Sequence, residues 1–360
     1  MRDYRVIDAD GHVQEAGIPW ADLLEPPFRD RAPRSVQDNR GVTRLLIEGK
    51  LWPKPEGLGT GFQLPWYRRG PVVAGATDPH ARLRDMDTEG LDVAVLFGTT
   101  VFLSLPFLED RDLACALARV YNNWVADYCR ADPTRLKAVA LLPMQEPAEA
   151  ARELRRAVTE LGMVGATTTA HAGGRNLDDP AFYPVYAEAE RLGVPLCVHV
   201  GAGRPAAGAD RFRNFFMTHT LCHAFEQMIG MVSLIGGGIL ELYPTLRVAF
   251  LEAGCGWVPY WLERMDEQYE MLHAHVPLCK HEPSYYARSG RVYVSFEAEE
   301  RALPWVMQAW DENQLVLATD YGHPDAMFPE TVRHFEARTD VPEAAKPKLL
   351  GANAARLFNL

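Results

Sequence analysis

An aspartate and a histidine stand two residues apart near the start of the chain, in Asp8-Ala-Asp-Gly-His12. Asp10 is the last residue of a short apolar run, Tyr4–Asp10, which predicts a β-strand, and His12 follows two residues later. Alternate residues of a strand point to the same face, so the carboxylate of Asp10 and the imidazole of His12 can converge on one divalent metal ion. Asp8 shares this parity, and we expect it to support the pair by hydrogen bonding from one layer deeper.

Two further ligand-type residues end apolar runs later in the chain. His199 lies in Pro195–Val200, and Asp320 directly follows Leu315–Thr319. Taken singly, such a histidine is more often a core residue and such an aspartate a helix N-cap. The carboxyl ends of barrel strands meet at one face, however, so together these residues predict one mixed nitrogen–oxygen metal site. The predicted ligands are Asp10, His12, His199 and Asp320. This donor set favours one Zn²⁺, with Mn²⁺ or Fe²⁺ as alternatives.

Three residues are predicted to be catalytic. Asp320, beside the metal, is the expected general base or acid. Glu252 ends the apolar run Leu246–Glu252 and is expected to be a ligand, a base or a hydrogen-bond partner, unless it belongs to the N-cap region of the next helix. His223 lies four residues after His219, and we expect it to face the pocket and assist proton transfer, with an exposed helix position as the alternative.

Three residues are predicted to contact the substrate. They are His171, after the apolar run Met163–Thr169; Arg204, in the loop 202–218; and Trp66, in the long segment 16–79. The alternatives are a structural loop position for His171, a solvated surface side chain for Arg204, and a packing or oligomer contact for Trp66. The run Met163–Thr169 contains no lysine, which excludes a carbamylated lysine bridging two metals and favours a single metal ion.

The order of elements predicts one domain, 1–360, with a (β/α)8 barrel fold. Eight apolar runs alternate with helical patterns, as a parallel sheet buried on both faces requires. The predicted strands are Tyr4–Asp10, Leu91–Gly98, Leu136–Pro143, Met163–Thr169, Pro195–Val200, Leu246–Glu252, Arg291–Glu297 and Leu315–Thr319. The predicted helices are Arg82–Glu89, Asp112–Ala131, Pro147–Leu161, Pro180–Leu192, Thr220–Leu242, Gly256–Leu272 and Glu300–Trp310. The segment 16–79 interrupts this rhythm after the first strand and is predicted to form a lid.

Composition narrows the class of protein further. The 360 residues carry a net charge of −11, which disfavours nucleic acid and anionic membranes as partners. Six cysteines without a CxxC spacing indicate reduced thiols, and neither a signal peptide nor an apolar run of about 18 residues is found. We therefore expect a cytoplasmic enzyme that acts on a small molecule.

Several segments resemble the amidohydrolase superfamily, in the branch that contains aminocarboxymuconate-semialdehyde decarboxylase and the aromatic-acid decarboxylases. The segments are Ile7-Asp-Ala-Asp-Gly-His12, Arg84-Asp-Met-Asp-Thr-Glu-Gly-Leu-Asp-Val-Ala-Val95, Pro195-Leu-Cys-Val-His199, Leu317-Ala-Thr-Asp-Tyr321 and Asn353-Ala-Ala-Arg-Leu-Phe358. The resemblance covers essentially the whole chain. It implies a barrel with Asp10, His12, His199 and Asp320 as metal ligands, and a homodimer or larger assembly.

One departure bears on the reaction. Decarboxylases of this branch usually carry a histidine where this chain has Glu252, and a glutamate where it has Cys255. On that ground hydrolysis by a metal-activated water, with Asp320 as base, is the first interpretation. The alternative is non-oxidative decarboxylation of an aromatic or unsaturated acid, in which Asp320 protonates the carbon. A binding protein without turnover is the third interpretation.

Overall fold

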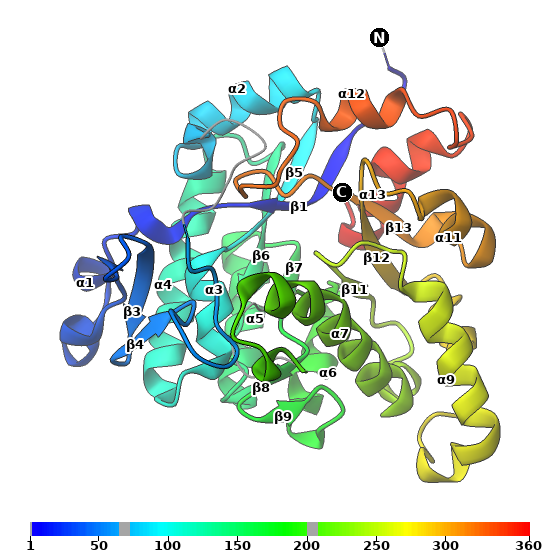
Figure 1. The fold of residues 1–360 in the computed structure, drawn as a ribbon, viewed down its shortest axis with the longest axis horizontal. Coiled ribbons are helices and arrows are strands. Elements are labelled where there is room, and N and C mark those ends of the chain that lie inside the picture. The colour runs from blue at the N-terminus through cyan, green and yellow to red at the C-terminus, as the bar shows by residue number, and fades with distance from the viewer. Residues whose placement is uncertain (1, 65–72, 200–207) are drawn as a thin grey trace.

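Eight parallel strands form the centre of the molecule in a computed structural model that describes residues 2–64, 73–199 and 208–360. The strands are β1 (Ile7–His12), β5 (Val93–Phe97), β6 (Leu136–Leu141), β7 (Gly165–Thr168), β10 (Leu196–Val198), β11 (Val248–Phe250), β12 (Val292–Glu297) and β13 (Leu315–Ala318). They pair in this order, and helices surround them (Figure 1). The backbone N–H of Asp320 donates to the carbonyl of Asp10 at 3.1 Å, which joins the last strand to the first. The predicted (β/α)8 barrel is confirmed.

Apolar side chains cover both faces of the barrel strands. One buried apolar cluster, which includes Ile7, Val95, Cys197 and Leu251, fills the interior. A larger cluster lies between the strands and the surrounding helices. Because both faces of the sheet are buried, the strands appear in the sequence as nearly continuous apolar runs.

The helices around the barrel match the predicted ones closely. They are α2 (Pro79–Glu89), α4 (Arg111–Cys129), α5 (Pro147–Leu161), α6 (Tyr183–Leu192), α7 (Phe215–Gly236), α9 (Val258–Leu272) and α11 (Leu303–Ala309). Gly162 and Gly193 end α5 and α6 in the left-handed conformation that favours glycine. The helix predicted over Thr220–Leu242 is two helices: α7, which begins five residues earlier, and α8 (Ile239–Leu242), separated by Gly237 and Gly238. Short helices missing from the prediction are α3 (Thr100–Ser104), α10 (Pro283–Ala287), α12 (Thr331–Glu336) and α13 (Asn353–Phe358).

The segment 16–79 contains a small domain-like sheet. The sheet has three antiparallel strands, β2 (Arg34–Gln37), β3 (Thr43–Ile47) and β4 (Lys50–Trp52), and the short helix α1 (Trp20–Leu23) precedes it. Trp52 stacks on Phe107 with ring centroids 5.9 Å apart, and the N–H of Gly59 donates to the carbonyl of Phe212, just before α7. The segment thus packs beside the mouth of the barrel. Closure over the site remains a prediction, and Trp66 lies outside the described residues.

Glu15 fixes the loop that follows β5. Its buried carboxylate accepts hydrogen bonds from four successive backbone N–H groups, those of residues 99–102. These groups form the start of α3, where no backbone acceptor is available. Burial nevertheless raises the pKa of Glu15 above its ordinary value. The result is a rigid α3 that holds the ring of Phe102 edge-on against His199, with centroids 4.9 Å apart.

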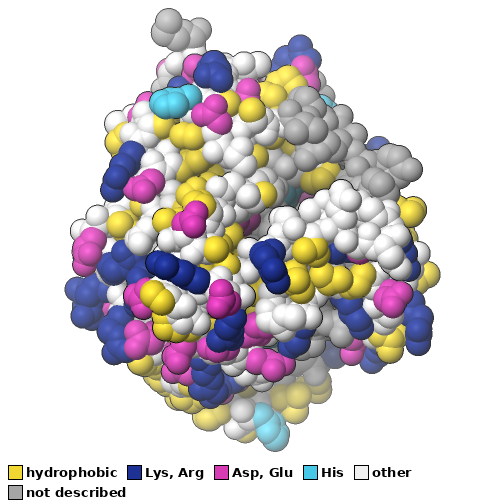
Figure 2. All heavy atoms as spheres, turned by 90° about the vertical axis from the view of Figure 1, so that its left-hand side faces the viewer, with side chains coloured by type: hydrophobic (Ala, Val, Ile, Leu, Met, Phe, Trp, Pro, Cys, Tyr) yellow, Lys and Arg dark blue, Asp and Glu magenta, His cyan; other side chains and the backbone are white. Residues whose placement is uncertain are grey.

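Acidic and basic side chains intermingle on the face that carries this insertion (Figure 2). Neither sign of charge dominates it. The exclusion of nucleic acid as a partner stays a prediction from net charge. Among the described residues, no helix combines the length and the apolar character that crossing a bilayer would need.

The buried carboxyl of Glu89, at the end of α2, is expected to make the stability of the fold depend on pH. Its carboxylate accepts from the N–H of Val332 at 2.8 Å, and burial raises its pKa to about 7. The unfolded chain loses this proton near pH 4.5, so the carboxyl destabilises the fold increasingly as the pH rises from about 4.5 to 7. Glu89→Gln should therefore raise the melting temperature at pH 8 relative to the wild type, and change it little at pH 4.5. Equal shifts at both pH values, measured by circular dichroism, would contradict this.

Candidate metal centre

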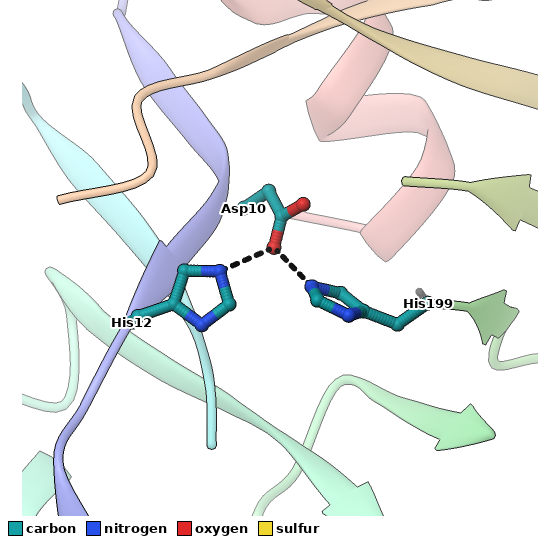
Figure 3. Close-up of side chains that lie close together, drawn as sticks. All are labelled: Asp10, His12 and His199. Carbon is teal, nitrogen blue, oxygen red and sulfur yellow. Dashed lines mark ion pairs between the residues drawn. The ribbon is translucent and has the colours of Figure 1, made fainter. Parts of the chain in front are cut away.

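The carboxylate of Asp10 lies between two imidazoles at the mouth of the barrel (Figure 3). Its Oδ1 is 3.5 Å from Nε2 of His12 and 3.4 Å from Nε2 of His199. All three residues are buried. Asp10 and His12 come from β1 and His199 follows β10, so two separate strands supply the group, as the sequence predicts.

The tautomer of His12 leaves a lone pair directed at these carboxylates. Its Nδ1 lies 3.1 Å from the carbonyl oxygen of Gly98, which can only accept, so Nδ1 carries the proton. Burial lowers the pKa of His12 well below its ordinary value, which keeps the ring neutral. Nε2 then faces Oδ1 of Asp10 and, at 3.9 Å, Oδ1 of Asp320 with no proton to share.

These atoms fit a divalent cation. Both oxygens of Asp10, Nε2 of His12 and Oδ1 of Asp320 are buried without a hydrogen-bond partner among the described residues. Burial also raises the pKa values of Asp10 and Asp320, and the charge of Asp10 adds to the effect on Asp320. Buried polar atoms are otherwise satisfied, and metal ligands about 2.0–2.2 Å from one ion lie roughly 3–4 Å apart, as here.

Glu252 orients one of the ligands from behind. Its Oε2 is 3.2 Å from Nδ1 of His199, and its Oε1 is 3.2 Å from Nδ1 of His323. A carboxylate that holds Nδ1–H of a histidine directs Nε2 of that ring at the metal. Of the three expected roles, the geometry therefore favours the hydrogen-bond partner. Glu252 and Asp320 both have positive φ, 60° and 49°, a conformation that is uncommon in residues other than glycine and costs backbone strain.

His323 is a member of this site that the sequence interpretation missed. Its ring stacks on His12 with centroids 3.8 Å apart, and it belongs with His12 and Asp320 to a second group of possible metal ligands. It lies in the turn after β13, where its N–H donates to the carbonyl of Asp320 at 2.9 Å. The one available signal was its position three residues after a predicted ligand.

Asp8 supports the ligands, as predicted. Its carboxylate accepts from the backbone N–H of Asp10 and from both the N–H and the hydroxyl of Thr319. The guanidinium of Arg82, 3.7 Å away, balances its charge and also donates to the carbonyl of His12 at 3.0 Å. The guanidinium also lies 3.8 Å from the ring centroid of Tyr321, so Arg82 ties the ends of β1 and β13, which carry three of the predicted ligands, to α2.

Two of the remaining predicted residues, His223 and His171, are described by the structure. His223 is half-buried on α7, where the charges of Glu252 and His199 act on it. His171, on β8 (His171–Ala172), is paired with the buried Glu226 of α7 at 3.3 Å. Arg204 lies outside the described residues. The roles of these residues in substrate binding and proton transfer stay predictions.

A family model of amidohydrolases matches residues 7–360. The chain belongs to this family. Among curated relatives, 2-amino-3-carboxymuconate-6-semialdehyde decarboxylase of Dictyostelium discoideum is 28% identical over 80% of this chain and 79% of its own length. Gamma-resorcylate decarboxylase of Rhodococcus jostii is 28% identical over 78% of this chain and 87% of its own. The amidohydrolase is therefore an enzyme of the predicted branch.

A solved structure resembles this amidohydrolase over nearly its whole length. It is 5-carboxyvanillate decarboxylase of Novosphingobium aromaticivorans, in complex with manganese and 4-hydroxy-3-methoxy-5-nitrobenzoic acid. The match covers 99% of this chain and 97% of that one, with 26% identity and a TM-score of 0.73. Manganese in this relative gives no support to zinc as the first choice of metal.

Glu252→Gln should weaken metal binding without unfolding the protein. The amide keeps one acceptor oxygen but turns an N–H₂ group toward one of the two imidazoles, so both can no longer be held. Loss of such a supporting carboxylate typically costs 10–100-fold in metal affinity. Competition with a chelator for Mn²⁺ measures the change. Glu300→Gln is the control, because Glu300 accepts from the N–H groups of Cys255 and Gly256 on the same loop and contacts no ligand.

Proposed function

We propose that this amidohydrolase is a metal-dependent, non-oxidative decarboxylase of an aromatic or unsaturated acid. One observation carries the proposal. Asp10, His12, His199 and Asp320 stand together at the barrel mouth of a chain that resembles decarboxylases of such acids over most of its length.

A divalent metal held by Asp10, His12, His199 and Asp320 would supply the positive charge that attracts an anionic substrate. The protein residues do the rest. Asp10, His12 and His199 present their donor atoms from buried, fixed positions, and Phe102 excludes water from the flank of His199. Asp320 is the partly exposed member, with 14% of its side chain accessible, and so can reach the reacting carbon. When the bond to CO₂ breaks, its electron pair stays on that carbon, and Asp320 delivers the proton that replaces the carboxylate.

Hydrolysis, the first interpretation from sequence, finds no support in the comparisons. It rested on the replacement of the usual histidine and glutamate by Glu252 and Cys255. The structure answers part of that argument, because Glu252 does not stand alone: it is hydrogen-bonded to His323, which brings an imidazole to the same mouth from the turn after β13.

Mn²⁺ is the metal we propose, with Zn²⁺ as the alternative. The donor set contains two carboxylates and two imidazoles, which suits both ions. The manganese in the solved relative favours Mn²⁺.

Release of CO₂ tests the function directly. The Mn²⁺-loaded enzyme should convert 2,6-dihydroxybenzoate, 5-carboxyvanillate or a related hydroxylated benzoate into CO₂ and the arene in equal amounts. In D₂O the arene should carry one deuterium at the former carboxylate position. A panel of lactones and aryl esters, followed by acid release, is run in parallel. Acid release from that panel, with no CO₂ from any of the acids, would restore hydrolysis as the function.

A further inference from the structure

One side chain of α7 anchors this helix to the strand ends beneath the metal centre. Nε2 of the fully buried Gln227 donates to the carbonyl of Val198 at 3.0 Å and to that of Leu251 at 2.8 Å. These two residues immediately precede His199 and Glu252. Gln227 therefore fixes the height of α7 relative to both of them.

His223 lies one helical turn before Gln227 on the same face of α7. One turn rises about 5.4 Å, and here it leads away from the strand ends and out toward the mouth. His223 consequently stands above His199 and Glu252. The charges of both residues act on its ring, which agrees with this placement.

The hydrogen bonds of His223 fix its tautomer. Nδ1 lies 3.1 Å from the carbonyl oxygen of His219, four residues earlier, and this oxygen can only accept. Nδ1 therefore carries the proton, and the Sγ atom of Cys222, 3.1 Å away, lies beside it. Burial lowers the pKa of His223, so the ring is neutral. Nε2 is then a pure acceptor, and no described residue donates a hydrogen bond to it.

We propose that Nε2 of His223 accepts a hydrogen bond from a donor substituent of the substrate, a phenolic hydroxyl or an amino group next to the carbon that loses CO₂. This assignment rests on the proposed function, which places the carboxylate end of the substrate at the metal centre. His223 then recognises the substrate instead of assisting proton transfer, the role that the sequence predicts for it. As a neutral acceptor above the metal centre, it selects acids that carry a hydrogen-bond donor and rejects ethers and unsubstituted rings.

Binding of unreactive ligands tests the assignment without turnover. The probes are 2-nitroresorcinol, 2-nitrophenol and 3-methoxy-2-nitrophenol, which share a nitro group and one hydroxyl and differ only in the second substituent. The Mn²⁺-loaded wild type should bind 2-nitroresorcinol about tenfold more tightly than the other two, the effect of one neutral hydrogen bond. Isothermal titration measures the three constants.

Variants at position 223 separate recognition from a structural role. His223→Phe should lose the tenfold preference while it retains Mn²⁺ and binds 2-nitrophenol as before, and His223→Gln, which keeps an acceptor, should retain part of the preference. Thr220→Ala, an exposed position on the same helix, is the control and should leave the preference unchanged. A preserved preference in His223→Phe, equal weakening of all three probes, or no preference in the wild type would overturn the proposal. Preference without CO₂ release from any acid would instead leave this inference standing and remove the proposed function.

Discussion

Replacement of Asp320 by asparagine is expected to lower the rate of CO₂ release by at least about a thousandfold, since general acid catalysis alone typically contributes 10²–10⁴-fold and a charged ligand is lost with it. The variant should fold normally. Oδ1 of Asp320 is buried near Asp10 and has no hydrogen-bond partner among the described residues, and burial raises the pKa of the carboxyl. A neutral amide of the same shape therefore removes a repulsion and breaks no described hydrogen bond of Oδ1. We expect the melting temperature of the metal-free protein to stay the same or rise.

The measurement is CO₂ release with saturating Mn²⁺, beside the melting temperature and the Mn²⁺ content. Asp311→Asn is the matched control. It lies near the other end of β13, where its side chain caps a short turn by accepting from the N–H of Asn313, and asparagine caps equally well. Turnover within tenfold of the wild type, in a variant that holds Mn²⁺, would show that Asp320 does not deliver the proton.

The predicted ligands came together because their signals are local. Asp10 and His12 share a strand face, and His199 and Asp320 end apolar runs whose carboxyl ends must meet in a barrel. The ligand positions therefore followed from the alternation of side chains along one strand and from the places where the apolar runs end. Asp8 could be assigned its supporting role for the same reason, since parity along β1 determines which way it points.

His323 and the role of Glu252 depend on contacts that no local pattern encodes. The left-handed backbone of Asp320 turns the chain so that the ring of His323 returns over His12. Glu252, which follows β11, then contacts His323. Neither contact follows from spacing. The small sheet of the insertion, by contrast, has a local signal in its sequence: Glu48-Gly49, both with positive φ, connects β3 and β4 as a tight hairpin turn.

Removal of the metal should abolish CO₂ release and destabilise the fold together. Without a cation, both oxygens of Asp10 and Oδ1 of Asp320 stay buried beside the lone pair of His12, with no hydrogen-bond partner in the part of the chain that the structure describes. A metal that binds the folded chain and not the unfolded one stabilises the fold by about 4 kcal/mol when its free concentration is a thousand times Kd. For a chain of this size, that free energy corresponds to a rise of roughly 5–10 °C in melting temperature. Treatment with a chelator should therefore lower the melting temperature by that amount, and Mn²⁺, at about one ion per chain, should restore both properties.

Asp10→Asn distinguishes this site from loosely bound metal elsewhere. The variant loses the carboxylate that lies between His12 and His199, so its melting temperature should no longer respond to Mn²⁺ or to the chelator. Because the amide also relieves the burial of a charge, the metal-free variant should be at least as stable as the metal-free wild type. A wild-type protein that keeps its melting temperature and its turnover after complete removal of metal would refute a metal centre at the barrel mouth. A metal response that survives in Asp10→Asn would place the stabilising ion at some other position in the chain.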